Sequence, residues 1–280
     1  MKIKLITMMV LFLSFTMMSQ NFTGKAIYKT SRKSDFKIGG ENSTMSENQV
    51  KEIEARLQKM NQKTYILTFS TYESIYKEDV KLNDPKPRAN AMNVMVFGDS
   101  GGTDVYYKNI KEKRFANKTA IMGKPFLVKD SLPIYDWQLS SETKNIGLYT
   151  CFKASFSKDV ENTTATFVNG ELKEVKKMET IVTTAWYTMQ VPISNGPSTF
   201  YGLPGLILEI NDGTKMMVCT EIVMNPSEKI TIEEPEKGKI VNQADFDKIS
   251  EEKSKEMMES FSGRGGVDIG NGINIKVIGN

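Results

Sequence analysis

The sequence predicts an α+β protein in which a large, curved antiparallel β-sheet forms a half-open barrel and two helices pack against it. Three observations support this fold class. Short stretches rich in Tyr, Ile, Phe, Val and Thr recur between turn-forming residues, two segments have apolar residues at helical spacing, and no internal repeat is present. The pattern gives roughly nine to twelve strands, and a twisted open sheet of about ten or more is expected to curl.

The first expected element is an export signal at residues 1–19. Lys2 and Lys4 precede the mostly apolar stretch Leu5–Met18, and the small residue Ser19 precedes the expected cleavage point. The apolar stretch is shorter than the roughly 20 residues that a membrane-spanning helix needs. We therefore expect an exported chain that is periplasmic, associated with the outer membrane, or extracellular.

A strand and a helix are expected next. Residues 22–30 alternate between apolar and polar side chains, as strands do. Residues 46–60 predict the first helix, because Ser46 and Gln49 have the spacing of a capping box. One apolar stripe follows at helical spacing: Val50, Ile53, Leu57 and Met60. Residues 64–77 are rich in Tyr, Ile, Phe and Thr, and they favour one long strand.

The middle of the chain indicates an antiparallel meander. Short strands alternate with turn signals between Met92 and Phe156, and Thr180–Gln190 is a further strand. A hairpin is expected between Leu206–Ile210 and Met216–Met224, because the Asp-Gly pair between them favours a tight turn that matches the strand twist.

The end of the chain predicts a second helix and a tail. Apolar residues at helical spacing place the helix at residues 242–261. Residues 262–280 are rich in glycine and asparagine, and they are expected to be a tail that is disordered or forms an edge strand at 273–278. We therefore expect one β-rich domain at residues 20–261.

The composition excludes much catalytic chemistry. The chain contains no histidine, so it has neither a Ser-His-Asp relay nor an imidazole metal site. Residues 98–102 spell GDSGG, the string around the nucleophile of trypsin-like proteases, but Ser100 has no histidine base to activate it and is expected in a polar turn. The net charge of +3 is dispersed, which argues against nucleic-acid binding. We expect no enzyme and no cofactor.

The two cysteines form a candidate disulfide. Cys151 and Cys219 are the only cysteines, and an exported chain enters compartments where disulfides persist. Each lies opposite the main apolar residues of its strand, so both are expected on one face of the sheet. We predict a disulfide that closes a loop of about 69 residues and contributes roughly 4 kcal/mol. Two free thiols are the alternative.

A hexapeptide is the most distinctive motif of the chain. It reads Gly202-Leu203-Pro204-Gly205-Leu206-Ile207 and leads directly into a strand. Its proline fixes the backbone, and its two glycines allow backbone angles or close contacts that other residues do not. Its leucines are too apolar for an exposed turn. We therefore expect the loop to be buried against the sheet as part of the core.

This hexapeptide resembles the signature of the GLPGLI family of exported bacterial proteins. The resemblance extends over about residues 135–222 and includes Trp137, Glu142, Lys144, Ile146, Tyr149, Cys151, Lys153 and Ala154, followed by Trp186, Tyr187, Thr188, Pro192, Gly196, Pro197 and Phe200. One departure is Leu148, which stands where family members commonly have glycine. The resemblance implies an exported, mostly uncharacterised protein with no assigned catalytic residue. Family context suggests an accessory role in outer-membrane transport.

The leading functional expectation is a non-enzymatic cell-envelope protein that binds an apolar ligand or an envelope protein partner through its sheet. The many aromatic residues and the lack of a catalytic constellation support it. One alternative is a periplasmic carrier of lipid or lipoprotein, because such carriers also have a half-open barrel and a helix. A second is soft-metal handling, suggested by Met216-Met217 and Met257-Met258. In the leading expectation no residue is assigned as a metal ligand.

Overall fold

The structure is a computed structural model, and it describes residues 22–32, 62–80, 104–168, 171–263 and 274–278. Within these residues the chain forms one sheet of 13 strands and one helix. The elements are β1 (Gly24–Arg32), β2 (Lys63–Phe69), β3 (Glu73–Glu78), β4 (Val105–Asn109), β5 (Arg114–Ile121), β6 (Lys124–Ser131), β7 (Gln138–Ile146), β8 (Tyr149–Val168), β9 (Glu171–Thr188), β10 (Leu206–Asn211), β11 (Lys215–Met224), β12 (Lys239–Val241), α3 (Gln243–Gly263) and β13 (Asn274–Ile278).

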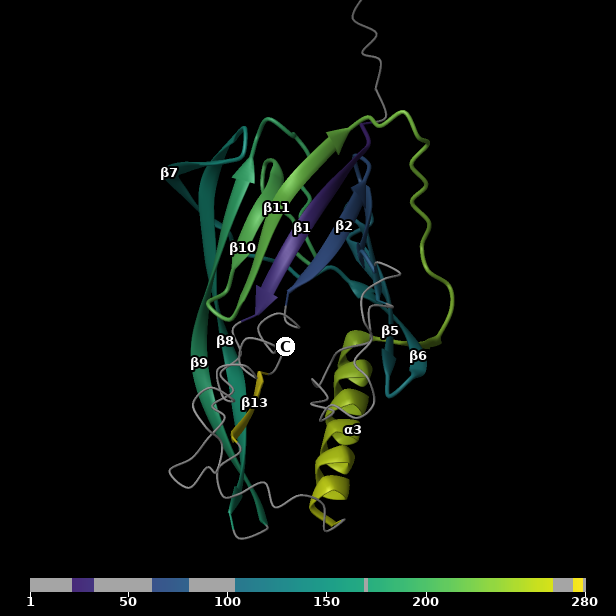
Figure 1. Ribbon diagram of the computed structural model, residues 1–280, viewed down its shortest axis with the longest axis vertical. Coiled ribbons are helices and arrows are strands. Elements are labelled where there is room, and N and C mark those ends of the chain that lie inside the picture. The colour runs from purple at the N-terminus through teal and green to yellow at the C-terminus, as the bar shows by residue number, and fades with distance from the viewer. Residues whose placement is uncertain (1–21, 33–61, 81–103, 169–170, 264–273, 279–280) are drawn as a thin grey trace, which may run out of the picture.

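The sheet is mixed and open. Its strand order is β12-β6-β5-β4-β3-β2-β1-β11-β10-β9-β8-β13, and β7 pairs with β8 outside this path. β12 pairs parallel with β6, whereas the other pairs are antiparallel. Figure 1 shows β1, β2, β10 and β11 in the middle of the sheet, between the long β8 and β9 on one side and β5 and β6 on the other.

The predicted fold class is wrong. An α+β class requires helices that cover a sheet face, but the described chain is nearly all sheet, and α3 is its one helix. This helix packs on the sheet near its start, where the Phe246 ring meets the Phe126 ring edge to face at 5.6 Å. The sheet is also mixed where an antiparallel half-open barrel was expected. The predicted helix at 46–60 lies outside the described residues.

The expected long strand at residues 64–77 is divided into two. The backbone NH of Ser70 donates to the carbonyl oxygen of Glu73 at 2.8 Å, and the NH of Glu73 donates to the Ser70 hydroxyl oxygen at 3.1 Å. These bonds close a tight turn, so β2 and β3 form a hairpin. Tyr and Thr occur throughout the segment, and this composition masks a turn that one serine side chain stabilises.

Other predicted elements are confirmed. The hairpin across Asn211–Lys215 joins β10 and β11, the second helix is α3, and the tail strand is β13 at the edge of β8. β8 and β9 pair from Phe152 and Tyr187 to Val168 and Glu171 as one long hairpin that projects beyond its neighbours (Figure 1). Among the described residues, no helix is long and apolar enough to cross a membrane.

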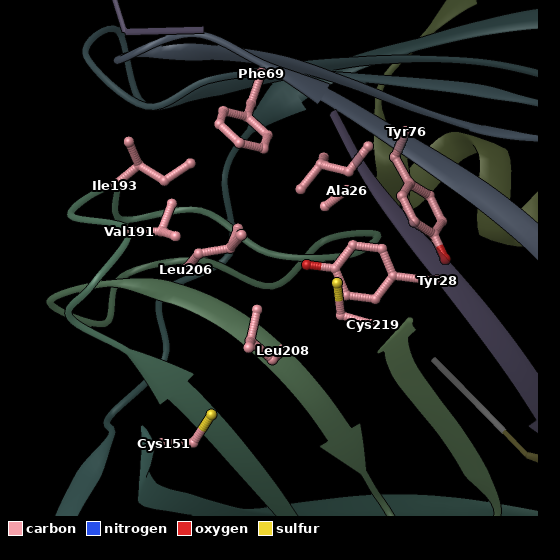
Figure 2. Packing of buried hydrophobic residues seen from close by; sticks show 11 residues of the cluster. Ala26, Tyr28, Phe69, Tyr76, Cys151, Val191, Ile193, Leu206, Leu208 and Cys219 are labelled. Carbon is pink, nitrogen blue, oxygen red and sulfur yellow. The ribbon is translucent and has the colours of Figure 1, made fainter. Parts of the chain in front are cut away.

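Residues 189–205, which we call the plug, connect β9 to β10 and cover one face of the sheet. Val191, Ile193 and Leu203 are at most 3% exposed. The first two belong to the same apolar cluster as Phe69 and Leu206, and Figure 2 shows these side chains together. The hexapeptide therefore starts in the plug and ends in β10. We call the sheet face beneath it the plug face.

Candidate functional site

A fully buried lysine anchors the plug. Lys108 lies in β4, and its side chain is 0% exposed. Its Nζ donates to the carbonyl oxygens of Gly196, at 2.7 Å, and Phe200, at 2.9 Å. Burial lowers the pKa of Lys108 well below its ordinary value, because the interior solvates an ammonium group poorly. The lysine thus fixes the backbone of the plug against the sheet.

A second polar contact lies next to this lysine. The side-chain oxygen of Asn195 accepts hydrogen bonds from the Ser74 hydroxyl, at 3.3 Å, and from the NH of Gly196, at 2.8 Å. Ser74 in β3 is the cross-strand partner of Lys108. Lys108, Ser74 and the side-chain oxygen of Asn195 therefore position the plug, whereas Nδ2 of Asn195 is buried without a hydrogen-bond partner in the described part of the chain.

The hexapeptide itself is held by close backbone contacts. A Cβ at Gly205 would lie 2.1 Å from the carbonyl oxygen of Thr188, so only glycine fits there. Gly202 has a φ of 97° and lies over the indole of Trp137. That indole donates its NH to the carbonyl oxygen of Tyr201 at 2.9 Å. Leu203 is buried, as are the two residues that end the hexapeptide, Leu206 and Ile207, whereas Gly202 and Pro204 are exposed.

Half-buried aromatic rings gather beside the plug, and we call them the aromatic cluster: Tyr135, Trp137, Phe156, Phe200 and Tyr201. Tyr135 is its centre, with ring centroids at 5.0 Å from Phe156 and 5.5 Å from Phe200. Its hydroxyl donates to the Thr199 hydroxyl at 2.9 Å. Burial raises the pKa of Tyr135 to about 12, so its phenol stays neutral at physiological pH. The cluster is a neutral surface that remains partly open to solvent.

The face of β7, β8, β9 and β10 that lies opposite the plug face is charged. Both carboxylate oxygens of Glu209 bind Nζ of Lys144, at 2.7 and 2.8 Å, and this nitrogen lies 4.5 Å from the ring centre of Trp186. Lys153 pairs with Glu142 at 2.8 Å. Four of these residues, Glu142, Lys144, Lys153 and Trp186, belong to the sequence resemblance, and Lys153 is the cross-strand partner of Trp186.

The two cysteines are not bridged. Cys151 and Cys219 are buried free thiols, on strands that are separated by β9 and β10. Neighbouring strands are about 4.8 Å apart, so their backbones are farther apart than the roughly 7 Å that a disulfide allows. Figure 2 shows Leu208 between them. Parity predicted a shared face, but it does not show how many strands intervene.

The remaining predicted residues are structural or lie elsewhere. Tyr187, Thr188 and Pro197 are buried. Met217 is buried and accepts a hydrogen bond from the Tyr76 hydroxyl at 3.9 Å, while Met216 is 37% exposed, so the two do not converge. The side chains of Met257-Met258 and the GDSGG string lie outside the described residues. Within the described part, no group of three or more Cys, Asp or Glu residues is placed to hold a metal ion.

Sequence reasoning missed Lys108 and Tyr106. Both lie in β4, whose sequence Val-Tyr-Tyr-Lys-Asn is typical of a half-exposed strand. A lysine at a strand end is usually solvated, and no local signal distinguishes this one. Only the plug, 88 residues away along the chain, makes it a buried group.

One family model matches part of the chain, and it assigns no activity. Residues 137–209 match a family model described as "Protein of unknown function (Porph_ging)". This segment contains β7, β8, β9, the plug and most of β10. No curated protein matches the chain.

Two solved structures of PNGF-II, in C2 and P21 space groups, are similar to part of the chain. The TM-scores are 0.47 and 0.46, the identity is 14% in both cases, and each match covers 83% of this chain. The matches cover 33% and 34% of the PNGF-II chains, so this chain spans about a third of their length.

Proposed function

We propose that this protein is a non-enzymatic cell-envelope protein that binds an apolar ligand at the aromatic cluster. The proposal rests on one observation. Aromatic rings from three separate segments, near residues 135, 156 and 200, meet on one face and stay partly exposed. Apolar sites in proteins are typically lined by such rings, with a few polar groups that orient the ligand.

The polar groups beneath the plug support binding over catalysis. Lys108 and Asn195 are almost fully buried, and the hydrogen bonds of the Lys108 nitrogen and of the Asn195 side-chain oxygen go to the plug backbone or to Ser74. A general base or nucleophile must reach its substrate. The resemblance to the exported GLPGLI family supports a location in the envelope, and an acyl chain is the specific form of apolar ligand that we favour.

The test uses the tryptophans of the chain. Only two exist, Trp137 in the aromatic cluster and Trp186 on the charged face. In residues 20–280 carrying Trp186→Phe, the remaining indole reports on the cluster. Titration with 1-octanol is expected to shift its emission in a saturable way.

Two variants decide the outcome of this titration. Tyr135→Ala removes the centre of the cluster and is expected to abolish the saturable shift. Tyr72→Ala removes an exposed tyrosine in the β2–β3 turn, and it should leave the shift unchanged. A linear response without saturation, or an equal response in the Tyr135→Ala protein, would contradict the proposed function.

A further inference from the structure

A row of three polar side chains runs along β4 on the plug face. Asp104 precedes the strand, and Tyr106 and Lys108 follow at alternate positions, so all three lie on one side. Lys108 is satisfied by the plug. The other two are not: the Oδ1 atom of Asp104 and the hydroxyl of Tyr106 are buried, and neither has a hydrogen-bond partner in the described part of the chain.

Leaving both atoms unpaired is energetically unfavourable. A buried acceptor or donor without a partner costs about 1–3 kcal/mol, and a charged group costs more. Native structures contain few such groups, and each calls for an explanation such as a bound ion or ligand. Two positions along one strand face correspond to about 7 Å. The two side chains are therefore neighbours on one face of β4.

Tyr106 connects this pair to the aromatic cluster. Its ring stacks on Phe115 with centroids 5.1 Å apart. Burial is the main cause of its raised pKa, and the nearby phenols of Tyr135 and Tyr201 raise it further. The phenol is thus neutral and lies beside the aromatic rings, two positions along the chain from Asp104.

The charges around Asp104 favour a cation. The pairing of Lys77 with Val105, continued by one residue, places Glu78 opposite Asp104. Glu78 accepts a hydrogen bond from Nζ of Lys63 at 3.1 Å. One of the two facing carboxylates therefore has a lysine partner, while the buried oxygen of the other has no donor within the described residues.

We propose that Asp104 and Tyr106 form a polar subsite for the ammonium group of an amphiphilic amine whose apolar chain lies on the aromatic cluster. An ammonium group supplies the donors that the carboxylate oxygen lacks, and such charge-assisted bonds are stronger than neutral ones. Neighbouring aromatic faces also attract a cation. The inference rests on the proposed function and deepens it by naming the chemical class of the ligand.

Three probes with the same eight-carbon chain test the subsite. Octylammonium, 1-octanol and octanoate are titrated at pH 7 into the Trp186→Phe protein, with Trp137 emission as the signal. Octylammonium is expected to bind at least about tenfold more tightly than 1-octanol, and octanoate more weakly than both. Asp104→Asn should reduce the affinity for octylammonium about tenfold and leave that for 1-octanol unchanged.

A control variant and a stability measurement separate the explanations. Asp136→Asn removes an exposed carboxylate beside the aromatic cluster, and it should not change octylammonium binding. Asp104→Asn should unfold no more readily than the parent, because it removes a charge with an unpaired buried oxygen. If 1-octanol binds but octylammonium binds no more tightly, or if Asp104→Asn has no effect, the subsite is overturned and the proposed function stands. If none of the probes binds, the proposed function fails.

Discussion

The side-chain nitrogen of Lys108 lies 2.7 Å from the carbonyl oxygen of Gly196, so the interior of the sheet holds the plug through a lysine and a backbone carbonyl. A second carbonyl, that of Phe200, completes the contact at 2.9 Å. Phe200 belongs to the aromatic cluster. The lysine therefore connects the fold of the sheet to the geometry of the proposed binding surface.

Replacing this lysine tests that connection. Lys108→Met keeps the length of the side chain but leaves two buried carbonyls without their donor. At pH 9 we expect a loss of about 1–3 kcal/mol in the free energy of unfolding, measured by urea denaturation. Lys77→Met, at an exposed position of the neighbouring strand β3, serves as the control and should stay within about 0.5 kcal/mol. Equal effects of the two substitutions would contradict the anchoring role.

The same lysine predicts a dependence of stability on pH. Burial lowers its pKa in the folded state below the value of about 10.4 for the unfolded chain, so unfolding takes up a proton between the two values. Stability relative to the Lys108→Met variant should therefore rise with pH across this window, by at most about 1.4 kcal/mol per pH unit. Urea unfolding of both proteins at pH 7, 8 and 9 measures the difference. A difference that stays constant, or that falls as the pH rises, would refute the claim that burial lowers the pKa of Lys108.

The elements that the sequence predicted correctly are those with a strong local signal. The Asp-Gly pair at 212–213 specified the β10–β11 hairpin through the φ of 86° that Gly213 adopts. The apolar stripe of α3 specified the described helix, and the apolar residues of the hexapeptide predicted its burial. Each of these signals lies within a few residues of the structure that it produces.

The features that sequence reasoning missed depend on distant segments. Burial of Lys108 requires the plug, and the separation of Cys151 from Cys219 depends on two intervening strands. The fold class also depended on how far helices cover the sheet, which no local pattern reports. Periodicity identifies the face of a residue, but not the element that covers this face.

The close approach at Gly205 predicts a large effect of a single methyl group. In Gly205→Ala, the new Cβ would lie 2.1 Å from the carbonyl oxygen of Thr188, which is backbone and cannot rotate away. Overpacking typically costs about 1–3 kcal/mol, and a clash with backbone should reach or exceed the upper value. Thermal unfolding compares it with Pro204→Ala at the exposed neighbouring position, where we expect a small change. Similar melting temperatures for the two variants would show that the hexapeptide is loosely packed.

The two thiols should be unreactive in the folded protein. Burial raises the pKa of Cys151 to about 11 and that of Cys219 to about 12, so little reactive thiolate exists at pH 8. A thiol reagent without reductant is expected to label neither in the native chain and both in urea. If urea exposes no thiol until a reductant is added, the chain contains the disulfide that the sequence predicted, and the strand order between β8 and β11 is incorrect.

The ion pair of Lys144 and Glu209 should contribute more to stability than its neighbour on the same face. The Glu209 side chain is 11% exposed, so Lys144→Met alone leaves a mostly buried carboxylate without its partner. A double-mutant cycle with Glu209→Gln, followed by urea unfolding, is expected to give a coupling energy of about 1–3 kcal/mol.

The pair of Lys153 and Glu142 has a similar distance, 2.8 Å, but its glutamate is 60% exposed. Its cycle, with Lys153→Met and Glu142→Gln, should therefore give less than about 1 kcal/mol, because water screens exposed pairs. Coupling energies in the reverse order would mean that Glu209 is solvated and that the charged face around Trp186 is not packed as described.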